Sequence, residues 1–169
     1  MWLYHRCPPE MVGQTIVPLR QLRALSRKHY VREQAKYTGR EWVREQHIPT
    51  LNCYWDEVVF LSAVPPVILR AKLERAGFHP APAMYYKIDP KALDPECATV
   101  LLWDEGTGDH YVPYRPEDME LYQSIPVATE QYYEASKYAS DEMPLLHAFV
   151  PQILYRGEID AGYAHTVPF

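Results

Sequence analysis

The stretch from Asp56 to Phe78, DEVVFLSAVPPVILRAKLERAGF, constrains the fold of this chain more than any other part of the sequence. Apolar β-branched and aromatic side chains follow one another in VVFL, which is typical of a strand buried on both faces. The double proline Pro65-Pro66 ends the strand and suits the first turn of a helix, and Gly77 suits the end of that helix. The stretch therefore predicts a buried strand followed by an amphipathic helix.

The remaining sequence supports a mixed α and β chain. Leu69, Leu73 and Ala76 recur at helical spacing, so we expect them to face the core. Turn residues and apolar patterns predict further strands at residues 2–6, 84–89, 99–104, 110–114 and 151–160, and helices from Pro18 onward and at 116–125 and 129–140. We predict a single α+β domain over residues 1–169, with two small, mostly antiparallel sheets around a cleft and flanking helices.

Size and composition limit the class of protein. With 169 residues, 47% of them hydrophobic, the chain is long enough for one domain with one core. The three cysteines are odd in number and lack CxxC spacing, which indicates a reducing cytoplasm and neither a disulfide framework nor a metal site. No window approaches eighteen consecutive apolar residues, so a membrane span is not expected. Motifs of the GxGxxG, P-loop and GxSxG types are absent from the sequence.

Basic residues are concentrated in one segment. Eight of the seventeen lysines and arginines lie in residues 20–44. Counted with the three glutamates Glu33, Glu41 and Glu45, residues 20–45 carry +5 against −5 for the whole chain. Such a segment is either a solvated helix face or a surface that binds phosphates. On the second interpretation Arg27, Arg32 and Arg40 are candidate nucleic-acid-binding residues. Gly39 is expected to interrupt the helix.

Polar residues stand at the ends of three predicted strands, in LYHR, VVFLSAVPP and PQILYRGEID. This order resembles the ADP-ribosyltransferase-like superfamily. The resemblance implies that NAD is the substrate, that His5 contacts the adenosine ribose and Arg6 the pyrophosphate, and that Ser62 supports the nicotinamide pocket. Gln152 or Glu158 would take the catalytic role of the third motif. Cleavage of the nicotinamide–ribose bond passes through an oxocarbenium-like state, which explains why a carboxylate or amide is wanted there.

The layout is also similar to the nucleic-acid-modifying members of that superfamily, namely DNA ADP-ribosyltransferase toxins and RNA 2′-phosphotransferases. The set LYHR, KYTGRE, IPTLNCYWDEVVFLS and PQILYRG further resembles small bacterial proteins of this size, which implies no function. Together these features favour an NAD-dependent transferase that acts on a nucleic acid or another macromolecule.

Each of these residues also has a plain structural interpretation. His5 fits a satisfied structural histidine, Ser62 fits a strand end that hydrogen-bonds the start of the next helix, and Gln152 and Glu158 fit surface positions. The alternative function is a non-enzymatic nucleic-acid- or protein-binding module built on residues 20–44. Its stacking faces would come from the aromatic residues in and near that segment, Tyr30, Tyr37, Trp42, Tyr54 and Trp55.

Overall fold

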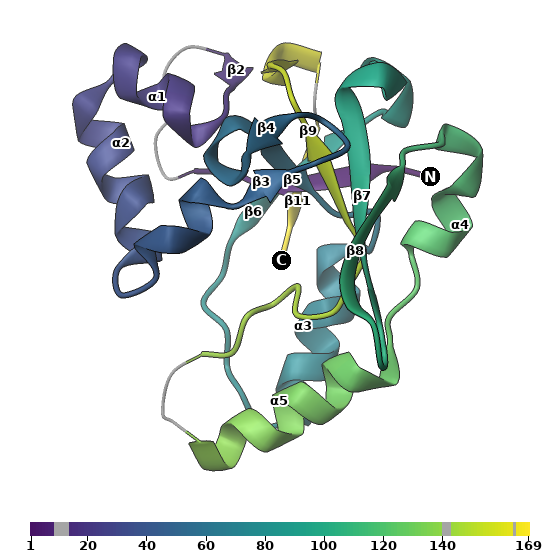
Figure 1. Ribbon diagram of the computed structural model, residues 1–169. Helices are drawn as coiled ribbons and strands as arrows, with labels where there is room; N and C mark the ends of the chain where they lie inside the picture. The colour runs from purple at the N-terminus through teal and green to yellow at the C-terminus, as the bar shows by residue number, and fades with distance from the viewer. Residues whose placement is uncertain (9–13, 140–142, 164) are drawn as a thin grey trace.

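The computed structural model describes residues 1–8, 14–139, 143–163 and 165–169 (Figure 1). The α-helices are α1 (Leu19–Leu25), α2 (Arg27–Gln34), α3 (Pro66–Arg75), α4 (Met119–Tyr122) and α5 (Val127–Ala139). The strands are β1 (Leu3–Arg6), β2 (Thr15–Ile16), β3 (His47–Ile48), β4 (Cys53–Tyr54), β5 (Val59–Leu61), β6 (Met84–Ile88), β7 (Ala98–Asp104), β8 (Gly108–Pro113), β9 (Gln152–Tyr155), β10 (Ile159–Asp160) and β11 (His165–Pro168). The predicted mixture of helix and strand is confirmed.

Two antiparallel sheets form the body of the protein. One has three strands in the order β1-β6-β11, and the other has four in the order β5-β9-β7-β8. Two smaller pairs, β10-β2 and β3-β4, are antiparallel as well. The β7-β8 hairpin turns between the strands expected at 99–104 and 110–114, and Gly106 and Gly108 have the positive φ values that such a turn requires. The domain therefore holds several small antiparallel sheets instead of two.

An isolated bridge joins the two main sheets at their edges. The Tyr4 N–H donates to the Ser62 carbonyl (2.7 Å) and the Ser62 N–H donates back to the Tyr4 carbonyl (3.0 Å). Ser62 directly follows β5, the buried strand predicted from the sequence. The bridge therefore brings β1 beside the end of β5.

The four-stranded sheet is covered on both faces. On one face, Val100 and Ile153 pack with residues of β1, β6 and α4 in the largest apolar cluster. On the other face, Leu101 and Leu154 pack against Ile48 of β3, Cys53 of β4 and Val58, the residue before β5. Burial on both sides explains why β5 and β9 read as continuous apolar runs and not as alternating patterns.

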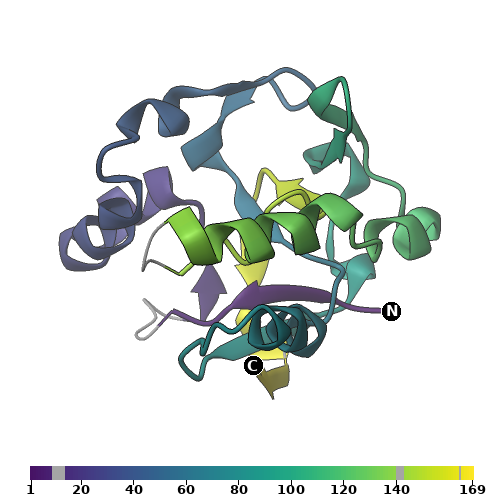
Figure 2. The ribbon, with the colours of Figure 1, turned by 90° about the horizontal axis from the view of Figure 1, so that it is seen from below.

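Helix α3 follows the expectation from its spacing. Leu69, Leu73 and Ala76 are all buried, and Leu73 and Ala76 pack with Tyr133 of α5. Figure 2, seen from below the view of Figure 1, shows α5 running across the molecule above α3. Gly77 has a positive φ directly after α3, as expected of a residue that ends a helix.

The segment 19–45 differs from the sequence prediction, and we call it the basic arm. The helix expected from Pro18 onward is broken at Ser26, whose extended backbone separates α1 from α2. Two 3₁₀ turns complete the arm, η1 (Ala35–Tyr37) and η2 (Glu41–Glu45), with Gly39 at a positive φ between them. None of these four elements contains a buried residue, and the arm lies to one side of the body (Figure 1).

The C-terminal region also differs from the prediction. The stretch 151–160, expected to be one closing strand region, divides into β9 and β10, which belong to different sheets. The sequence prediction missed β11, which pairs with β6 and closes the three-stranded sheet. Among the described residues, no helix has both the length and the apolar character needed to cross a membrane.

Candidate functional site

A cavity of about 260 Å³ lies between the basic arm and the body. The arm supplies one wall through α1 and α2. The other wall comes from β1, from β5 and from the 3₁₀ turn η3 (Trp55–Glu57) that precedes β5. Its lining residues are His5, Pro8, Thr15, Ile16, Val17, Leu19, Leu22, His29, Arg32, Glu33, Lys36, Tyr37, Trp55, Asp56, Val58, Val59 and Phe60. The lining is thus largely apolar and aromatic, with a few ionisable groups, as is typical of ligand sites.

His5 lies in this wall in a single defined tautomer. Its Nδ1 is 2.8 Å from the carbonyl oxygen of Phe60, and because a carbonyl only accepts, Nδ1 carries the proton. Nε2 is therefore an acceptor. Burial lowers the pKa of His5, and the charge of Lys36 lowers it further against the opposing effects of the Phe60 hydrogen bond and of Glu33. His5 is thus a neutral imidazole that can accept a hydrogen bond.

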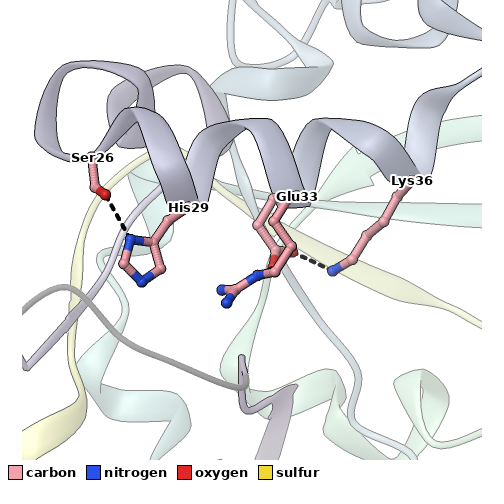
Figure 3. Close-up of polar contacts among 5 residues, drawn as sticks. Ser26, His29, Glu33 and Lys36 are labelled. Carbon is pink, nitrogen blue, oxygen red and sulfur yellow. Dashed lines mark hydrogen bonds and ion pairs between the residues drawn. The ribbon is translucent and has the colours of Figure 1, made fainter.

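Helix α2 presents a polar face to the cavity. His29 and Glu33 of α2 and Lys36 of the following turn η1 project from the same side, as their spacing of four and three residues requires (Figure 3). Ser26, at the start of the helix, lies with Oγ 2.6 Å from Nδ1 of His29, which orients that ring. The helix therefore places charged and neutral polar groups along one wall.

Glu33 is held as a carboxylate by its two cationic neighbours. Arg32 donates through Nε to Glu33 Oε1 (3.1 Å), and the ammonium group of Lys36 donates to Oε2. Burial opposes ionisation of Glu33, but the hydrogen bonds and charges of Lys36 and Arg32 outweigh it and keep its pKa below the usual range. The three side chains together leave one net positive charge at this wall.

Asp56 supplies a second carboxylate from the opposite wall. It sits in η3 and is 8% exposed, and its Oδ1 lies 2.8 Å from Nη2 of Arg20 on α1. Arg20 also reaches Glu57 (3.3 Å) and covers the ring of Tyr54 at 5.1 Å from its centroid. These contacts attach the basic arm to the body directly beside the cavity.

The Ser62 side chain has a structural contact. It is buried, and its Oγ accepts a hydrogen bond from the Val64 N–H (3.1 Å) in the turn before α3. This contact fits the structural interpretation of the sequence, in which Ser62 ends a strand and hydrogen-bonds the backbone that leads into the next helix. Ser62 does not line the cavity, but its backbone pairs with Tyr4, the neighbour of His5.

Gln152 and Glu158 lie in different places. Phe60 pairs with Leu154 across β5 and β9, so Gln152, two residues along β9, is on the same face of the sheet as the cavity-lining Phe60. Glu158 is exposed beyond the end of β9, where it accepts a hydrogen bond from the Gln21 amide of α1. Neither side chain lines the cavity.

The arginines predicted to bind phosphates also lie in different places. Arg6 is exposed at the end of β1, outside the cavity. Of the three arginines expected to meet nucleic acid, Arg32 lines the cavity, whereas Arg27 and Arg40 are exposed on the arm. Arg40 donates to the Lys36 carbonyl (3.2 Å) and lies 5.9 Å from the Tyr37 ring centroid. Arg27 and Arg32 belong to α2, whereas Arg40 directly precedes η2.

A second histidine, His147, lies within electrostatic reach of His5. Burial is the main cause that lowers its pKa to about 4, with a smaller electrostatic contribution from His5, and its buried Nδ1 has no hydrogen-bond partner among the described residues. Its segment is fixed by bonds from α5, from Thr129 Oγ1 to the Ala148 carbonyl (2.9 Å) and from the Tyr133 hydroxyl to the Leu146 carbonyl. Phe149 there has a φ of +63°, an unusual value for a bulky residue.

Sequence reasoning missed several cavity residues. Glu33 and Lys36 were counted as part of a charge segment, although their spacing from His29 already places the three on one helical face. Asp56 was treated only as the start of a strand. No local signal connects it with α1, because the two are brought together by tertiary packing. In the parts of the chain that the structure covers, no three metal-ligating side chains gather into a metal site.

The cavity can hold a neutral hydrogen-bonding group beside His5, an aromatic ring near Trp55 and Phe60, and an anion near Arg32 and Lys36. At about 260 Å³ it is slightly smaller than most ligand sites, roughly 300–1,000 Å³, so it would receive one part of a dinucleotide. Comparisons with models of protein families, with curated proteins and with solved structures found no match.

Proposed function

We propose that this chain is an NAD-dependent ADP-ribosyltransferase-like protein that acts on a nucleic acid or another macromolecule. The observation that carries the proposal is the position of His5. It is the polar residue near the end of the first strand, it lines a cavity, and its Nε2 is an acceptor because Nδ1 is engaged by the Phe60 carbonyl. An acceptor of that kind suits a ribose hydroxyl.

The charges around the cavity support a nucleotide as the ligand. At the wall formed by the arm, Arg32 and Lys36 exceed the charge of Glu33 by one, and the formal charge of Asp56 on the opposite wall brings the whole lining to zero. We assign the pyrophosphate to these two residues in place of Arg6, since charge-assisted bonds to phosphate are strong and Arg6 lies outside the cavity. The ring centroids of Trp55 and Phe60 are 4.8 Å apart, and these two rings form an apolar wall that suits a base or the nicotinamide ring.

The third-motif role falls to Gln152 in this proposal. Gln152 does not line the cavity, but it shares a sheet face with Phe60 and lies one strand from Ser62, so in this proposal it meets the part of the dinucleotide that extends beyond the cavity. Glu158 is exposed and bonded to Gln21. An amide can hold the ribose hydroxyls of NAD but carries no negative charge to stabilise an oxocarbenium-like state. We therefore expect binding to be retained and bond cleavage to be slow.

The test is an NAD titration by calorimetry together with an assay for released nicotinamide. Gln152→Ala should spare NAD binding and lower nicotinamide release by about 10²-fold or more, the pattern of an interaction made only in the transition state. Gln152→Glu should raise release above that of the wild type, because it restores a negative charge. Glu158→Ala is the matched control and should change neither quantity.

Two outcomes would count against the proposal. Wild-type protein that neither binds NAD at millimolar concentration nor releases nicotinamide over a day would remove it. Equal loss of nicotinamide release in the Glu158 and Gln152 variants would support the transferase activity but contradict the assignment of the third-motif role to Gln152 alone.

His5→Gln should weaken NAD binding by about the worth of one hydrogen bond, ~0.5–1.5 kcal/mol.

A second candidate, a nucleic-acid-binding module, is favoured by the outer surface of the basic arm. Arg27 and Arg40 are exposed there, and Trp42 is 64% exposed, which leaves its ring accessible to a base. The same surface would suit a nucleic-acid acceptor of the transferase.

Salt-dependent binding to single-stranded DNA and RNA tests this second candidate. Replacing Arg27 and Arg40 with alanine should weaken binding and flatten its dependence on salt. Arg75→Ala, an exposed arginine on α3, is the control and should have no effect. If the wild type binds no nucleic acid at low salt, a nucleic-acid partner is rejected and a protein acceptor becomes the better expectation.

A further inference from the structure

The cavity wall that the body supplies is fixed in the apolar core. Ile16 and Val59 belong to the largest apolar cluster, and Val58 belongs to the cluster on the other face of the four-stranded sheet. All three residues line the cavity, yet each is buried, so this part of the cavity is nearly closed to solvent. Because a packed core does not yield easily, a ligand that contacts these residues needs the opposite wall, formed by the basic arm, to move away.

The basic arm is fixed at its two ends and weakly packed between them. At one end β2 pairs with β10, and at the other the Trp55 N–H donates to the Gln46 carbonyl (2.9 Å). Between these ends, none of the arm's helices contains a buried residue, which is typical of a segment that opens locally. Ser26 and Gly39 interrupt the helical structure and give the arm two points at which its backbone can turn.

The side chain of Arg20 joins the arm to the fixed wall. Its guanidinium forms ion pairs with Asp56 and Glu57 and lies over the ring of Tyr54. All three partners lie in or directly before η3, the turn that leads into the body wall of the cavity. Because the Arg20 side chain is partly exposed, its ion pairs are weak and are screened by salt. Arg20 therefore holds the arm against the body reversibly.

We propose that the basic arm is a lid on the cavity and that Arg20 is its latch. When Arg20 releases η3, α1 and α2 turn away from the body and a ligand reaches Val58 and Val59. The inference goes beyond the proposed function, because it concerns access to the cavity whichever ligand enters. Arg20 controls this access without lining the cavity itself.

Cysteine labelling tests the inference, because it measures access to a buried position. In Val59→Cys the thiol lines the cavity, whereas in Val100→Cys it lies in the same apolar cluster, 0% exposed, and does not line the cavity. We expect an uncharged maleimide to modify the first thiol on the order of tenfold faster or more, since local opening costs less free energy than global unfolding. Mass spectrometry identifies the labelled position, so the native cysteines stay in place.

Two changes to the latch should speed the labelling of Val59→Cys and leave that of Val100→Cys unchanged. Arg20→Gln should raise the rate by about two- to fivefold, the range expected for exposed ion pairs. Sodium chloride at about 1 M, where the Debye length is about 3 Å, should have the same effect while Arg20 is present and little effect once it is replaced.

Arg23→Gln is the matched control for the latch. Arg23 is exposed on the same helix, and its contact with the ring of Tyr30 stays within the arm, so its replacement should not change the labelling rate. Thermal unfolding of each variant reports whether it is folded. Val58→Cys, in the same wall, replaces the reporter if Val59→Cys does not fold.

Two outcomes would overturn the inference. Equal labelling rates in Val59→Cys and Val100→Cys would show that the cavity opens only when the whole protein unfolds. A rate in Val59→Cys that responds neither to Arg20→Gln nor to salt would show that Arg20 is not the latch. Neither measurement uses NAD, so failure of the lid leaves the proposed function standing, and failure of the NAD titration leaves the lid standing.

Discussion

The sheet body and the basic arm of this protein are held in different ways. In the four-stranded sheet, Ile153 and Leu154 are 0% exposed on opposite faces of the same strand. In the arm, by contrast, none of the helical residues is buried, and Leu25 and Val31 are more than half exposed. The arm is attached through polar contacts, chiefly Arg20 with Asp56 and Glu57.

The difference matters because the cavity lies where the two regions meet. Apolar burial contributes most of the free energy of folding, whereas exposed ion pairs contribute little. The body wall of the cavity is therefore rigid, and the arm wall is the part able to open with a low free-energy cost. A ligand that contacts both walls would stabilise the arm by binding.

The largest test of the comparison removes apolar volume from the body. Leu154→Ala should lower the free energy of unfolding by about 2–5 kcal/mol, because it leaves a cavity among Ile48, Val58 and Leu101. Leu25→Ala makes the same chemical change in the arm and should cost no more than about 0.5 kcal/mol. Urea unfolding measures both. Similar losses in the two variants would contradict the division into body and arm.

The second test uses pH, through His147. Its pKa of about 4 in the folded protein is below that of an unfolded histidine, so between these values the unfolded chain binds more protons. Stability is then complete above about pH 6.5 and falls as the pH drops. Burial lowers the pKa of His5 as well, so its contribution has the same sign.

We expect the free energy of unfolding to fall by about 1–1.5 kcal/mol between pH 7.5 and 5.5 on account of His147. His147→Asn should remove most of that fall. His79→Asn, at an exposed position, should keep it. Urea unfolding at the two pH values gives the measurement, and an unchanged fall in the His147 variant would show that the imidazole is not held neutral by burial.

The smallest expected effect is on the attachment of the arm. Because the Arg20 side chain is 45% exposed, its removal in Arg20→Ala should lower global stability by no more than about 1 kcal/mol. Amide hydrogen exchange in α1 and α2 should nevertheless become faster, with β9 unchanged. Arg23→Ala, on the same helix but without an acidic partner in the described ion pairs, is the control. Exchange that stays the same in the arm would show that other contacts hold it.

Sequence reasoning succeeded where local pattern and burial agree. The α3 positions Leu69, Leu73 and Ala76 are buried because helical spacing puts them on one face. It failed where an element depends on distant partners. Strand β11 is short, and only its pairing with β6 makes it a strand.

For the candidate site, the sequence by itself determined the residue types and the order of the strands that carry them. His5 lies in β1, Ser62 directly follows β5 and Gln152 begins β9. These strands are neighbours, because β5 pairs with β9 and the Ser62 backbone bridges to β1. Only the tertiary structure decided which side chains meet at the cavity. It brought Asp56 to Arg20 and separated Glu158 from Gln152, because such contacts depend on how elements far apart in the sequence pack, and local pattern carries no record of that packing.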